Sequence, residues 1–451
     1  VKTLSTTERE KAEDFMSGVL RIFHPIGQGT FYSEHFCIAA AQNGRMNVVY
    51  DCGIISSSQY LKDAIDKTFR EGEKIEAVFI SHLHKDHISG IPHLIRRCNV
   101  KSIFFPLLTK QNKILAKIRL IAEGIDSEFC FRFIDSPKKA IEIEIGDKAR
   151  DIRLIGVFPD KNLGKNNKED SNDSDFISNP GEEIKGICDS TLQSGMSITD
   201  EEGRSIWPRW IYIPYNFEFN RRNSMLIKEL KSEGITVKEV TELGRNPGKY
   251  GEKIAIIKKM YGRVDNDFNS HYMTLYSGAI TKIERTFCYT LSNYECLSRC
   301  GNCPNPERMR FCGRYAPLLC EIKMPNIIRI LEEPFSRRSG CLYTGDYKMS
   351  DDEVVNELKQ KYSGYWKTLL AMQVPHHGSK LSFNRKLVMQ GVHYIISAAT
   401  KNGYEHPDKQ VKEDIRRKGG YINAVTEDFN SNVCFETWLQ FGSYGDARNS
   451  E

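Results

Sequence analysis

Long apolar segments are missing from this 451-residue sequence. A helix that spans a bilayer needs about 20 mostly apolar residues, and the longest apolar stretches here are only strand-sized. The beginning of the chain, VKTLSTTEREKAEDFMSG, is polar and lacks the apolar segment of a signal peptide. We therefore expect no membrane association and a cytoplasmic location.

A strong charge bias and an internal repeat are missing as well. Lys and Arg together number 64 against 59 for Asp and Glu, which gives a formal net charge of +5. This slight excess permits an anionic partner and fits an ordinary solvated surface equally well. No segment recurs at a fixed period, which argues against solenoid and propeller architectures. With 40% hydrophobic residues, the chain can still build a sizeable core.

Short apolar strands alternate with helical segments along much of the chain. Residues 75–80 (IEAVFI) and 100–105 (VKSIFF) are typical of strands buried on both faces. Helical segments follow them, at residues 89–98 and 110–124. This alternation predicts an α/β fold, and two similar halves around an irregular middle suit a four-layer sandwich.

A cluster of histidines and aspartate directly follows the first of these strands, in FISHLHKDHISG (residues 79–90). In an extended loop, His82 and His84 point the same way and can hold one ion. Asp86 and His87 lie at the turn into the next helix and face a second position. Because imidazole and carboxylate ligands suit Zn or Mn better than Ca, we expect two such divalent ions.

This loop resembles the signature of the metallo-β-lactamase fold superfamily, which implies an αββα sandwich with a mono- or dinuclear metal site. The resemblance assigns roles to residues in other motifs. Asp51, in VVYDCG, would orient a ligand histidine, and Asp346, in CLYTGDYK, would bridge the two ions. The last ligand would come from VPHHGSK, as either His376 or His377.

Several motifs are similar to the competence-type branch of this superfamily, which includes the C-terminal domain of the DNA-uptake channel protein ComEC. They are the TGD and PHHGS motifs, IGQGTFY at residues 26–32, GYEHP at residues 403–407, and the closing strand pair at residues 424–438. The resemblance thus runs from about residue 20 to about residue 440. It implies a nuclease, particularly one that acts on DNA.

One ligand position departs from the common pattern of the superfamily. Most members place a further histidine before the strand that precedes the bridging aspartate, and the segment here reads DFNSHYMTLYSG (residues 267–278). The competence-type branch uses an asparagine in this region, which makes Asn269 a candidate. His271 is an equally good candidate, and the sequence leaves the choice open.

The expected activity is metal-dependent hydrolysis of phosphodiester bonds. Two divalent ions activate a bound water, hold the scissile group and take up charge on the leaving oxygen. The catalytic group would comprise Asp51, Asp86, His87 and His406. Ser379 and Lys380 would contact a phosphate, as would His406, although all three also fit solvent-facing turns.

We expect a nuclease acting on DNA, with nucleic acid as its partner and a defence or nucleic-acid-processing role. Hydrolysis of a small phosphodiester or cyclic nucleotide is one alternative. A partner-binding subunit with a vestigial metal site is another. A protein partner or a homo-oligomer is also compatible with the sequence.

The thirteen cysteines divide into eight scattered ones, expected to be buried thiols, and a group of five between residues 296 and 320. Within the group, Cys296, Cys300, Cys303 and Cys312 have a spacing that predicts a structural zinc ion held by four thiolates. Cys288 or Cys320 could replace one ligand. Unligated thiols in a loop, or redox chemistry, are the other options.

These features divide the chain into a catalytic domain and less regular segments. A polar helix is expected over residues 1–18, the domain over residues 19–440 and a tail over residues 441–451. Insertions are expected at residues 158–262 (a polar loop, an aromatic strand and helices) and 282–338 (the Cys-rich segment).

Overall fold

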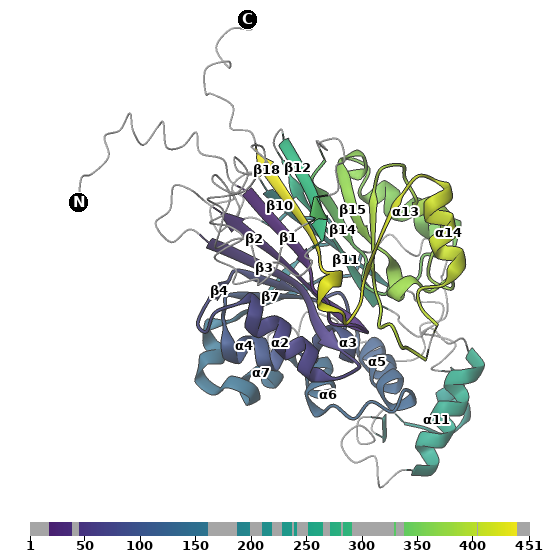
Figure 1. The fold of residues 1–451 in the computed structure, drawn as a ribbon. Helices are drawn as coiled ribbons and strands as arrows, with labels where there is room; N and C mark the ends of the chain where they lie inside the picture. The colour runs from purple at the N-terminus through teal and green to yellow at the C-terminus, as the bar shows by residue number, and fades with distance from the viewer. Residues whose placement is uncertain are drawn as a thin grey trace, which may run out of the picture.

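Two β-sheets lie face to face in the computed structural model, with helices on their outer sides (Figure 1). The structure describes residues 18–37, 45–160, 187–198, 210–218, 228–236, 239–240, 251–264, 271–280, 283–290, 329–330, 338–403 and 405–439. The predicted N-terminal helix, the C-terminal tail and the four candidate zinc cysteines lie outside these residues, so they stay predictions.

The first sheet is ten-stranded in the described part of the chain, with the order β13-β12-β18-β1-β2-β3-β5-β7-β8-β9. Its strands are β1 (Gly18–Phe23), β2 (Gly29–Cys37), β3 (Arg45–Ile54), β5 (Ala77–Phe79), β7 (Ser102–Pro106), β8 (Arg153–Val157), β9 (Ser190–Leu192), β12 (Ile283–Thr290), β13 (Arg329–Ile330) and β18 (Val433–Leu439). From β3 to β9 neighbouring strands are parallel, which aligns their carboxyl ends along one edge.

The second sheet has the order β10-β11-β14-β15-β16-β17. Its strands are β10 (Trp210–Glu218), β11 (His271–Ala279), β14 (Gly340–Tyr343), β15 (Leu369–Gln373), β16 (His393–Ser397) and β17 (Tyr421–Val425). The last four are parallel to one another. A short parallel pair, β4 (Lys74–Ile75) with β6 (Asn99–Val100), directly precedes β5 and β7 in the chain and lies beside β3.

Helices cover the outer face of each sheet (Figure 1). On the first sheet these are α2 (Ser58–Thr68), α3 (Lys85–Ile88), α4 (Ile91–Arg97), α5 (Lys110–Ala122), α6 (Glu128–Asp135) and α7 (Pro137–Ile145), and on the second α13 (Asp352–Lys361) and α14 (Lys409–Arg417). Helix α11 (Gly251–Val264) lies beside α5. Short 3-10 helices occupy Gly146–Asp151, Trp366–Thr368, Pro375–Gly378, Arg385–Leu387 and Phe429–Ser431. Side-chain caps begin several helices, as when Thr109 accepts a hydrogen bond from the backbone N–H of Asn112 in α5.

Three hydrophobic clusters separate the four layers. One fills the space between the first sheet and its helices, where Ile65 of α2 and Ile118 of α5 are buried. A second lies between the sheets and joins Phe23 of β1 to Leu370 of β15. The third lies beneath α13 and α14, where Leu358 is buried. The four-layer αββα sandwich expected from the sequence is therefore confirmed.

A buried ion pair joins the two sheets within the middle cluster. Nε of Arg21 on β1 lies 2.7 Å from Oε1 of Glu34 on β2. From the facing sheet, the hydroxyls of Ser277 and Tyr343 each donate to Glu34 over 2.8 Å. Burying an isolated charge costs free energy, and the hydrogen bonds from these partners offset that cost for the pair in the core.

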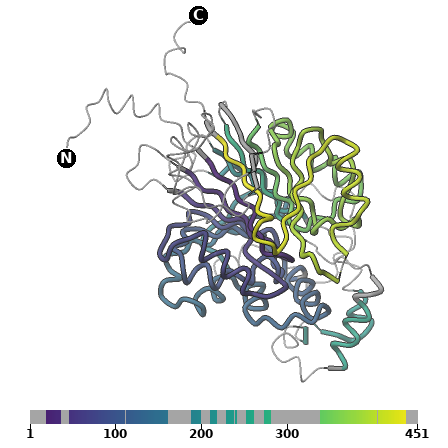
Figure 2. Tube along the Cα trace, viewed as in Figure 1, coloured from purple at the N-terminus to yellow at the C-terminus, as the bar shows by residue number. Residues whose placement is uncertain are grey.

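Both segments predicted as insertions contribute strands to the sheets. Within residues 158–262, β10 pairs along its whole length with β11. Within residues 282–338, β12 pairs with β18. β18 in turn pairs with β1, so the two ends of the described chain lie side by side, purple against yellow in Figure 2. The domain boundaries themselves stay a prediction.

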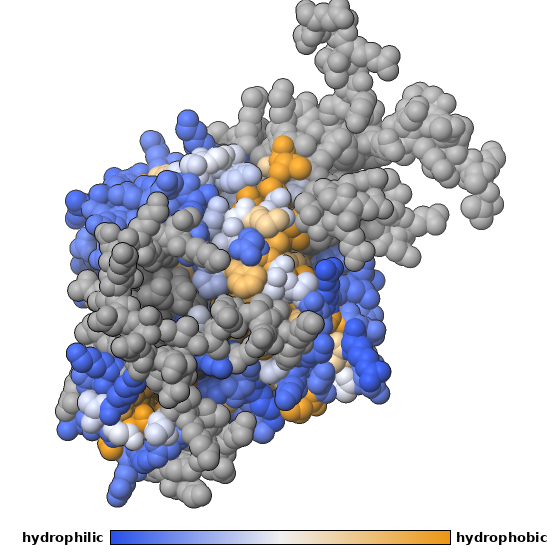
Figure 3. Space-filling view, turned by 180° about the vertical axis from the view of Figure 1, so that it is seen from behind, coloured by the Kyte–Doolittle hydropathy of each residue, from blue (hydrophilic) through white to orange (hydrophobic). Residues whose placement is uncertain are grey.

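On the face that Figure 3 shows, most of the described residues are hydrophilic. Seen from behind, hydrophobic residues show mainly as a strip at the centre of the face (Figure 3). In the part of the chain that the structure describes, no helix combines the length and apolar character needed to cross a bilayer.

Candidate metal centre

The His/Asp cluster lies where β5 ends and α3 begins. His82 and His84 belong to the connecting loop, and Asp86 and His87 lie in the first turn of α3. All four side chains are buried. This is the carboxyl end of a parallel strand, where loops are held firmly by the sheet and functional groups gather.

Two loops of the second sheet bring the remaining groups to the same place. Asp346 follows β14, and His377 follows the neighbouring strand β15. Nε2 of His377 lies 3.2 Å from Oδ2 of Asp86, and Nε2 of His87 lies 3.4 Å from Oδ1 of Asp346. Ligand atoms of Asp86, His87, Asp346 and His377 all lie within 4.8 Å of one another. These four residues, named here subsite 2, could hold one ion.

A second group, named here subsite 1, comprises His82, His84 and Asp86, whose ligand atoms are equally close together. Asp346 connects the two subsites. Its Oδ1 faces His87, whereas its Oδ2 lies 3.7 Å from Nε2 of His82. One carboxylate oxygen directed at each subsite is the arrangement that a bridging ligand requires.

Atoms without hydrogen-bond partners indicate that this arrangement suits metal ions. Within the described residues, Nε2 of His82, His84 and His87 and Oδ2 of Asp346 are buried and have no hydrogen-bond partner. Leaving such atoms unsatisfied costs about 1–3 kcal/mol each. All are good ligands for Zn or Mn, so the donor set fits two divalent ions.

Buried hydrogen bonds fix the direction of two of these histidines. The carboxylate of Asp51 accepts from Nδ1 of His87 and from the backbone N–H of Ser81, each over 2.7 Å. The carbonyl of Ser397 accepts from Nδ1 of His377 over 2.7 Å. In both rings the proton is held on Nδ1, which leaves the lone pair of Nε2 directed into the cluster.

Close backbone contact holds α3 against the end of β3. A Cβ atom added to Gly53 would lie 2.3 Å from the backbone nitrogen of His87, so no larger residue fits there. Asp51, two residues earlier, has φ of 53°, in the left-handed region that aspartate tolerates better than most residues. The DCG motif thus serves both the hydrogen bond to His87 and the approach of its helix.

The two histidines of the PHHG turn occupy different environments. Both have positive φ, 49° at His376 and 54° at His377. His377 is buried in subsite 2, whereas the side chain of His376 is 23% exposed, with its Nε2 3.9 Å from Oδ2 of Asp346. This geometry favours His377 as the ligand and places His376 at the open side of the cluster.

The other residues predicted for the site lie around its rim or beyond it. The ring of His406 lies 5.9 Å from that of His376. The hydroxyl of Ser379 accepts from the backbone N–H of Leu381 within its own turn. The side chain of Lys380 is 66% exposed, with its Nζ 3.6 Å from Asp408.

The candidates for the missing ligand are only partly visible. Asn269 lies outside the described residues, and of His271 only the backbone is described, as the first residue of β11. The next residue, Tyr272, packs its ring 5.4 Å from that of His82. The choice between Asn269 and His271 therefore stays open.

Burial and charge oppose each other in the cluster. Burial opposes protonation of His87, but the carboxylates of Asp86, Asp51 and Asp346 outweigh it and raise the pKa of His87 well above its ordinary value. Burial likewise opposes ionisation of Asp86, but His87 and His84 hold its pKa well below its ordinary value. Protons on the histidines thus balance the carboxylates, and a metal ion would take over that role.

A residue pair that sequence reasoning missed adjoins subsite 1. Oε2 of Glu123 lies 2.9 Å from Nε2 of His84, and Nε of Arg119 donates to Oε1 of Glu123 over 2.7 Å. An Arg and a Glu four residues apart on a helix is a common surface pattern. Nothing in the sequence therefore singles this pair out.

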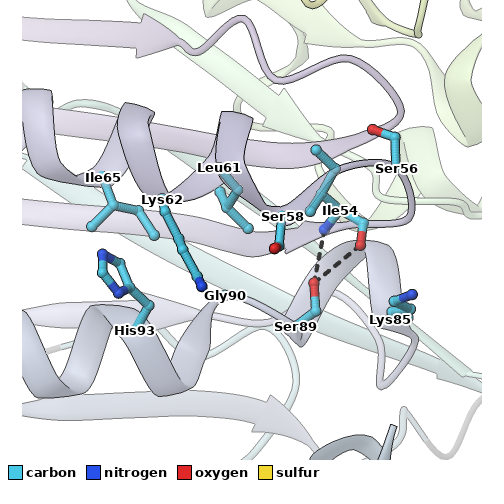
Figure 4. Close-up of a pocket in the computed structure, with 10 residues that line it drawn as sticks. All are labelled: Ile54, Ser56, Ser58, Leu61, Lys62, Ile65, Lys85, Ser89, Gly90 and His93. Atoms are coloured by element: carbon cyan, nitrogen blue, oxygen red, sulfur yellow. Dashed lines mark hydrogen bonds between the residues drawn. The ribbon is translucent and has the colours of Figure 1, made fainter. Parts of the chain in front are cut away.

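A separate pocket of about 210 Å³ lies on the other side of α3, between α2 and α4 (Figure 4). Lys85 and Ser89 line it, which places it on the helix face opposite Asp86 and His87. The hydroxyl of Ser89 bonds both the N–H and the carbonyl of Ile54, drawn as dashed lines in Figure 4. This side of α3 anchors the metal loop to β3.

Comparisons with known proteins point to one superfamily. A family model described as "Metallo-beta-lactamase superfamily" matches residues 37–110, which include Asp51 and the His82–His87 loop. Ribonuclease J of Mycoplasma pneumoniae (strain ATCC 29342 / M129) is 35% identical over 77 residues, which cover 16% of this chain and 13% of the relative. Ribonuclease BN of Escherichia coli O17:K52:H18 is 30% identical over 112 residues, or 25% of this chain and 34% of the relative.

A further Ribonuclease BN, from Escherichia coli strain SE11, is 26% identical over 167 residues, which cover 35% of this chain and 52% of the relative. The chain thus covers about half or less of each of these relatives. The competence-type branch stays a prediction. Together, the matched segment, the ribonuclease relatives and the αββα sandwich support a place for this chain in the metallo-β-lactamase superfamily.

Proposed function

We propose that this protein is a metal-dependent nuclease. The observation that carries the proposal is the pair of buried subsites joined by Asp346, whose two carboxylate oxygens face different ligand groups. Subsite 1 would hold one divalent ion, and subsite 2 the other. Two such ions supply an activated water at neutral pH and offset the charge that develops on the leaving oxygen.

The residues of the chain prepare the site for this chemistry. Asp51 and the carbonyl of Ser397 keep a proton on Nδ1 of His87 and His377, so both rings present Nε2 inward. At the open side, the rings of His376 and His406 lie 5.9 Å apart. Burial lowers the pKa of His406 to about 4, so its ring is neutral at pH 7. We assign contact with the phosphate group to these two histidines.

Charge favours an anionic substrate. Two divalent ions would bring four positive charges, against the three carboxylates of Asp51, Asp86 and Asp346. The ion pair of Arg119 and Glu123 adds no net charge. With a neutral water bound, the loaded centre would carry one net positive charge, which attracts a phosphodiester more strongly than an uncharged substrate.

DNA is the substrate that the competence-type motifs favour. RNA is the second candidate, because the relatives found by comparison include ribonucleases J and BN. Against a vestigial site stands the complete set of inward-facing ligands in subsite 2. A defence or nucleic-acid-processing role, and any protein partner, stay predictions.

The test is an assay with Mn²⁺ or Zn²⁺ on plasmid DNA, single-stranded DNA and RNA. We expect cleavage of DNA by the wild-type protein and none by the Asp86→Ala/His87→Ala double variant. Lys85→Ala is the matched control, because Lys85 belongs to the same helix but faces the pocket on its other side. Cleavage of RNA alone would make RNA, not DNA, the substrate of the proposed nuclease. Turnover of bis-(p-nitrophenyl) phosphate without cleavage of any polymer would overturn the nuclease proposal.

A further inference from the structure

Helix α5 and its C-terminal cap bring an ion pair to the metal centre from outside the predicted motifs. Arg119 lies in the last turn of α5, and Glu123 caps the helix. The side chain of Arg119 is 8% exposed and that of Glu123 is 21% exposed. A pair with this helical spacing normally faces solvent, so its burial beside His84 needs a reason.

The contacts of this pair lead to two ligand residues of the centre, both on the side of subsite 1. Oε2 of Glu123 is within hydrogen-bond distance of Nε2 of His84, at 2.9 Å. Oε1 of the same carboxylate accepts from Nε of Arg119. Nη2 of Arg119 lies 4.0 Å from Oδ2 of Asp346, the oxygen that faces subsite 1. One carboxylate therefore lies between a buried guanidinium and a candidate metal ligand.

Each ring nitrogen of His84 lies beside a different carboxylate. Nε2 faces Glu123, and Nδ1 contacts Asp86 inside subsite 1. A neutral imidazole carries one proton, and a carboxylate accepts that proton but cannot supply one at neutral pH. In the structure Nδ1 makes a hydrogen bond with Oδ1 of Asp86, whereas Nε2 makes none. An ion held by the lone pair of Nδ1 would require the proton of the ring on Nε2, where the carboxylate of Glu123, 2.9 Å away, would stabilise it. In subsite 2 the roles are reversed, because His87 and His377 hold the proton on Nδ1 and present Nε2.

We propose that Glu123 is a positioning residue that presents Nδ1 of His84 to the ion of subsite 1, and that Arg119 holds Glu123 in place. This inference rests on the proposed metal centre. Glu123 contacts His84 of subsite 1, and the carbonyl of Ser397 contacts His377 of subsite 2. Asp51 reaches both subsites, His87 directly and His82 through the hydroxyl of Ser81. Each subsite therefore has one support of its own, from a separate part of the chain.

The experiment titrates the metal-free protein with Co²⁺, whose absorption spectrum reports its ligands, and counts bound Co²⁺ by mass spectrometry. The wild-type protein should bind two ions. In Glu123→Ala, the affinity for one ion should fall about 10- to 100-fold, the range for loss of a group that supports a metal ligand, while the other ion binds as before. His377→Ala, which removes a member of subsite 2 alone, should weaken the other ion instead, with a different change in the spectrum.

A conservative variant separates this role from a structural ion pair. Glu123→Gln and Glu123→Ala both remove the charge opposite Arg119, but only Gln keeps an oxygen that can accept from Nε2 of His84. A positioning role predicts that Gln retains more Co²⁺ affinity than Ala. Equal losses of Co²⁺ affinity in the two variants would overturn the positioning role of Glu123. If Glu123→Ala does not fold, Glu123→Asp keeps the charge but shortens the reach, and it should weaken the same ion.

Glu128→Gln is the matched control, because Glu128 pairs with Arg132 at the same spacing and its side chain is 77% exposed. This variant should bind Co²⁺ as the wild type does. A wild-type protein that binds no Co²⁺ would refute the metal centre itself. A wild type that binds two ions, with a folded Glu123→Ala that binds them equally well, would leave the centre standing and refute the role of Glu123.

Discussion

Oδ2 of Asp51 lies 2.7 Å from Nδ1 of His87, which joins the end of β3 to the first turn of α3. The carboxylate can only accept, so it fixes the proton of His87 on the nitrogen that faces away from the cluster. The direction of a ligand thus depends on a residue far from it in sequence.

Replacing Asp51 by Asn should disturb this direction. An amide that donates to Nδ1 would move the proton of His87 to Nε2, where an ion should bind. We expect a fall of about 10- to 100-fold in metal affinity or activity, measured by titration and by phosphodiester turnover. Asp66→Asn is the control, because Asp66 pairs with His93 over 2.8 Å outside the cluster. Equal effects of the two changes would contradict the role of Asp51.

His376 and His377 should respond differently to substitution. His377→Ala removes a buried member of subsite 2, and we expect the number of bound ions to fall from two to one. His376→Ala removes a partly exposed side chain at the rim and should keep both ions while lowering the rate of turnover. Metal counting by mass spectrometry distinguishes the variants. Loss of an ion from His376→Ala alone would reverse the assignment.

Metal binding should release protons and weaken as the pH falls. Burial opposes the charge on His87, but its carboxylate neighbours raise the pKa well above the ordinary value of 6.5, so the metal-free ring holds an extra proton near neutrality. An ion must displace this proton, and the competition grows as the pH falls through the raised pKa. Calorimetry in buffers of different ionisation enthalpy measures the protons released. Heats that do not vary with the buffer would contradict this expectation.

The ion pair between Arg21 and Glu34 should matter for stability. Removing one partner of a buried pair leaves a buried charge and costs about 3–5 kcal/mol. Arg21→Met should therefore lower the free energy of unfolding strongly, whereas Arg21→Met/Glu34→Leu should recover part of the loss. Urea denaturation measures both. Glu128→Ala is the exposed control, because its side chain is 77% exposed, and it should cost less than about 1 kcal/mol.

The same pair should shape stability in acid. Burial opposes ionisation of Glu34, but Arg21 and the hydroxyls of Tyr212 and Tyr343 outweigh it and lower the pKa below the ordinary 4.5. A group with a lowered pKa in the folded state stabilises the protein above pH 4.5, and this stability is lost as the pH falls towards the folded pKa. Glu34→Gln should therefore flatten the dependence of unfolding free energy on pH below 4.5. An unchanged slope would show that other groups control acid unfolding.

Much of the fold could be predicted from short patterns. The apolar run at residues 75–80 contains β5, the run at residues 100–105 covers β7 except for Pro106, and the periodic segment at residues 110–124 contains α5. These patterns are local, since each strand or helix shows its buried face in its own residues. The prediction of four layers rested on the same local patterns, and the structure confirms it.

The metal loop could be predicted because its four candidate ligands lie within six consecutive residues, at His82, His84, Asp86 and His87. Arg119 and Glu123 could not, since their pattern is that of an exposed helix and only packing brings them to His84. The pairing of Glu34 with Arg21 was equally hidden, because it depends on the register of β1 against β2. Residues that act across elements are identified by tertiary contacts rather than by spacing.

The position of β18 between β1 and β12 has a consequence for synthesis of the protein. A ribosome delivers β1 early and residues 433–439 near the end of the described chain. Until then, β1 has an open hydrogen-bonding edge, and β12 has no neighbour to join it to the first sheet. A nascent chain stalled before residue 433 would therefore need a chaperone, or another surface that covers the edge of β1, to keep that edge from pairing with another chain.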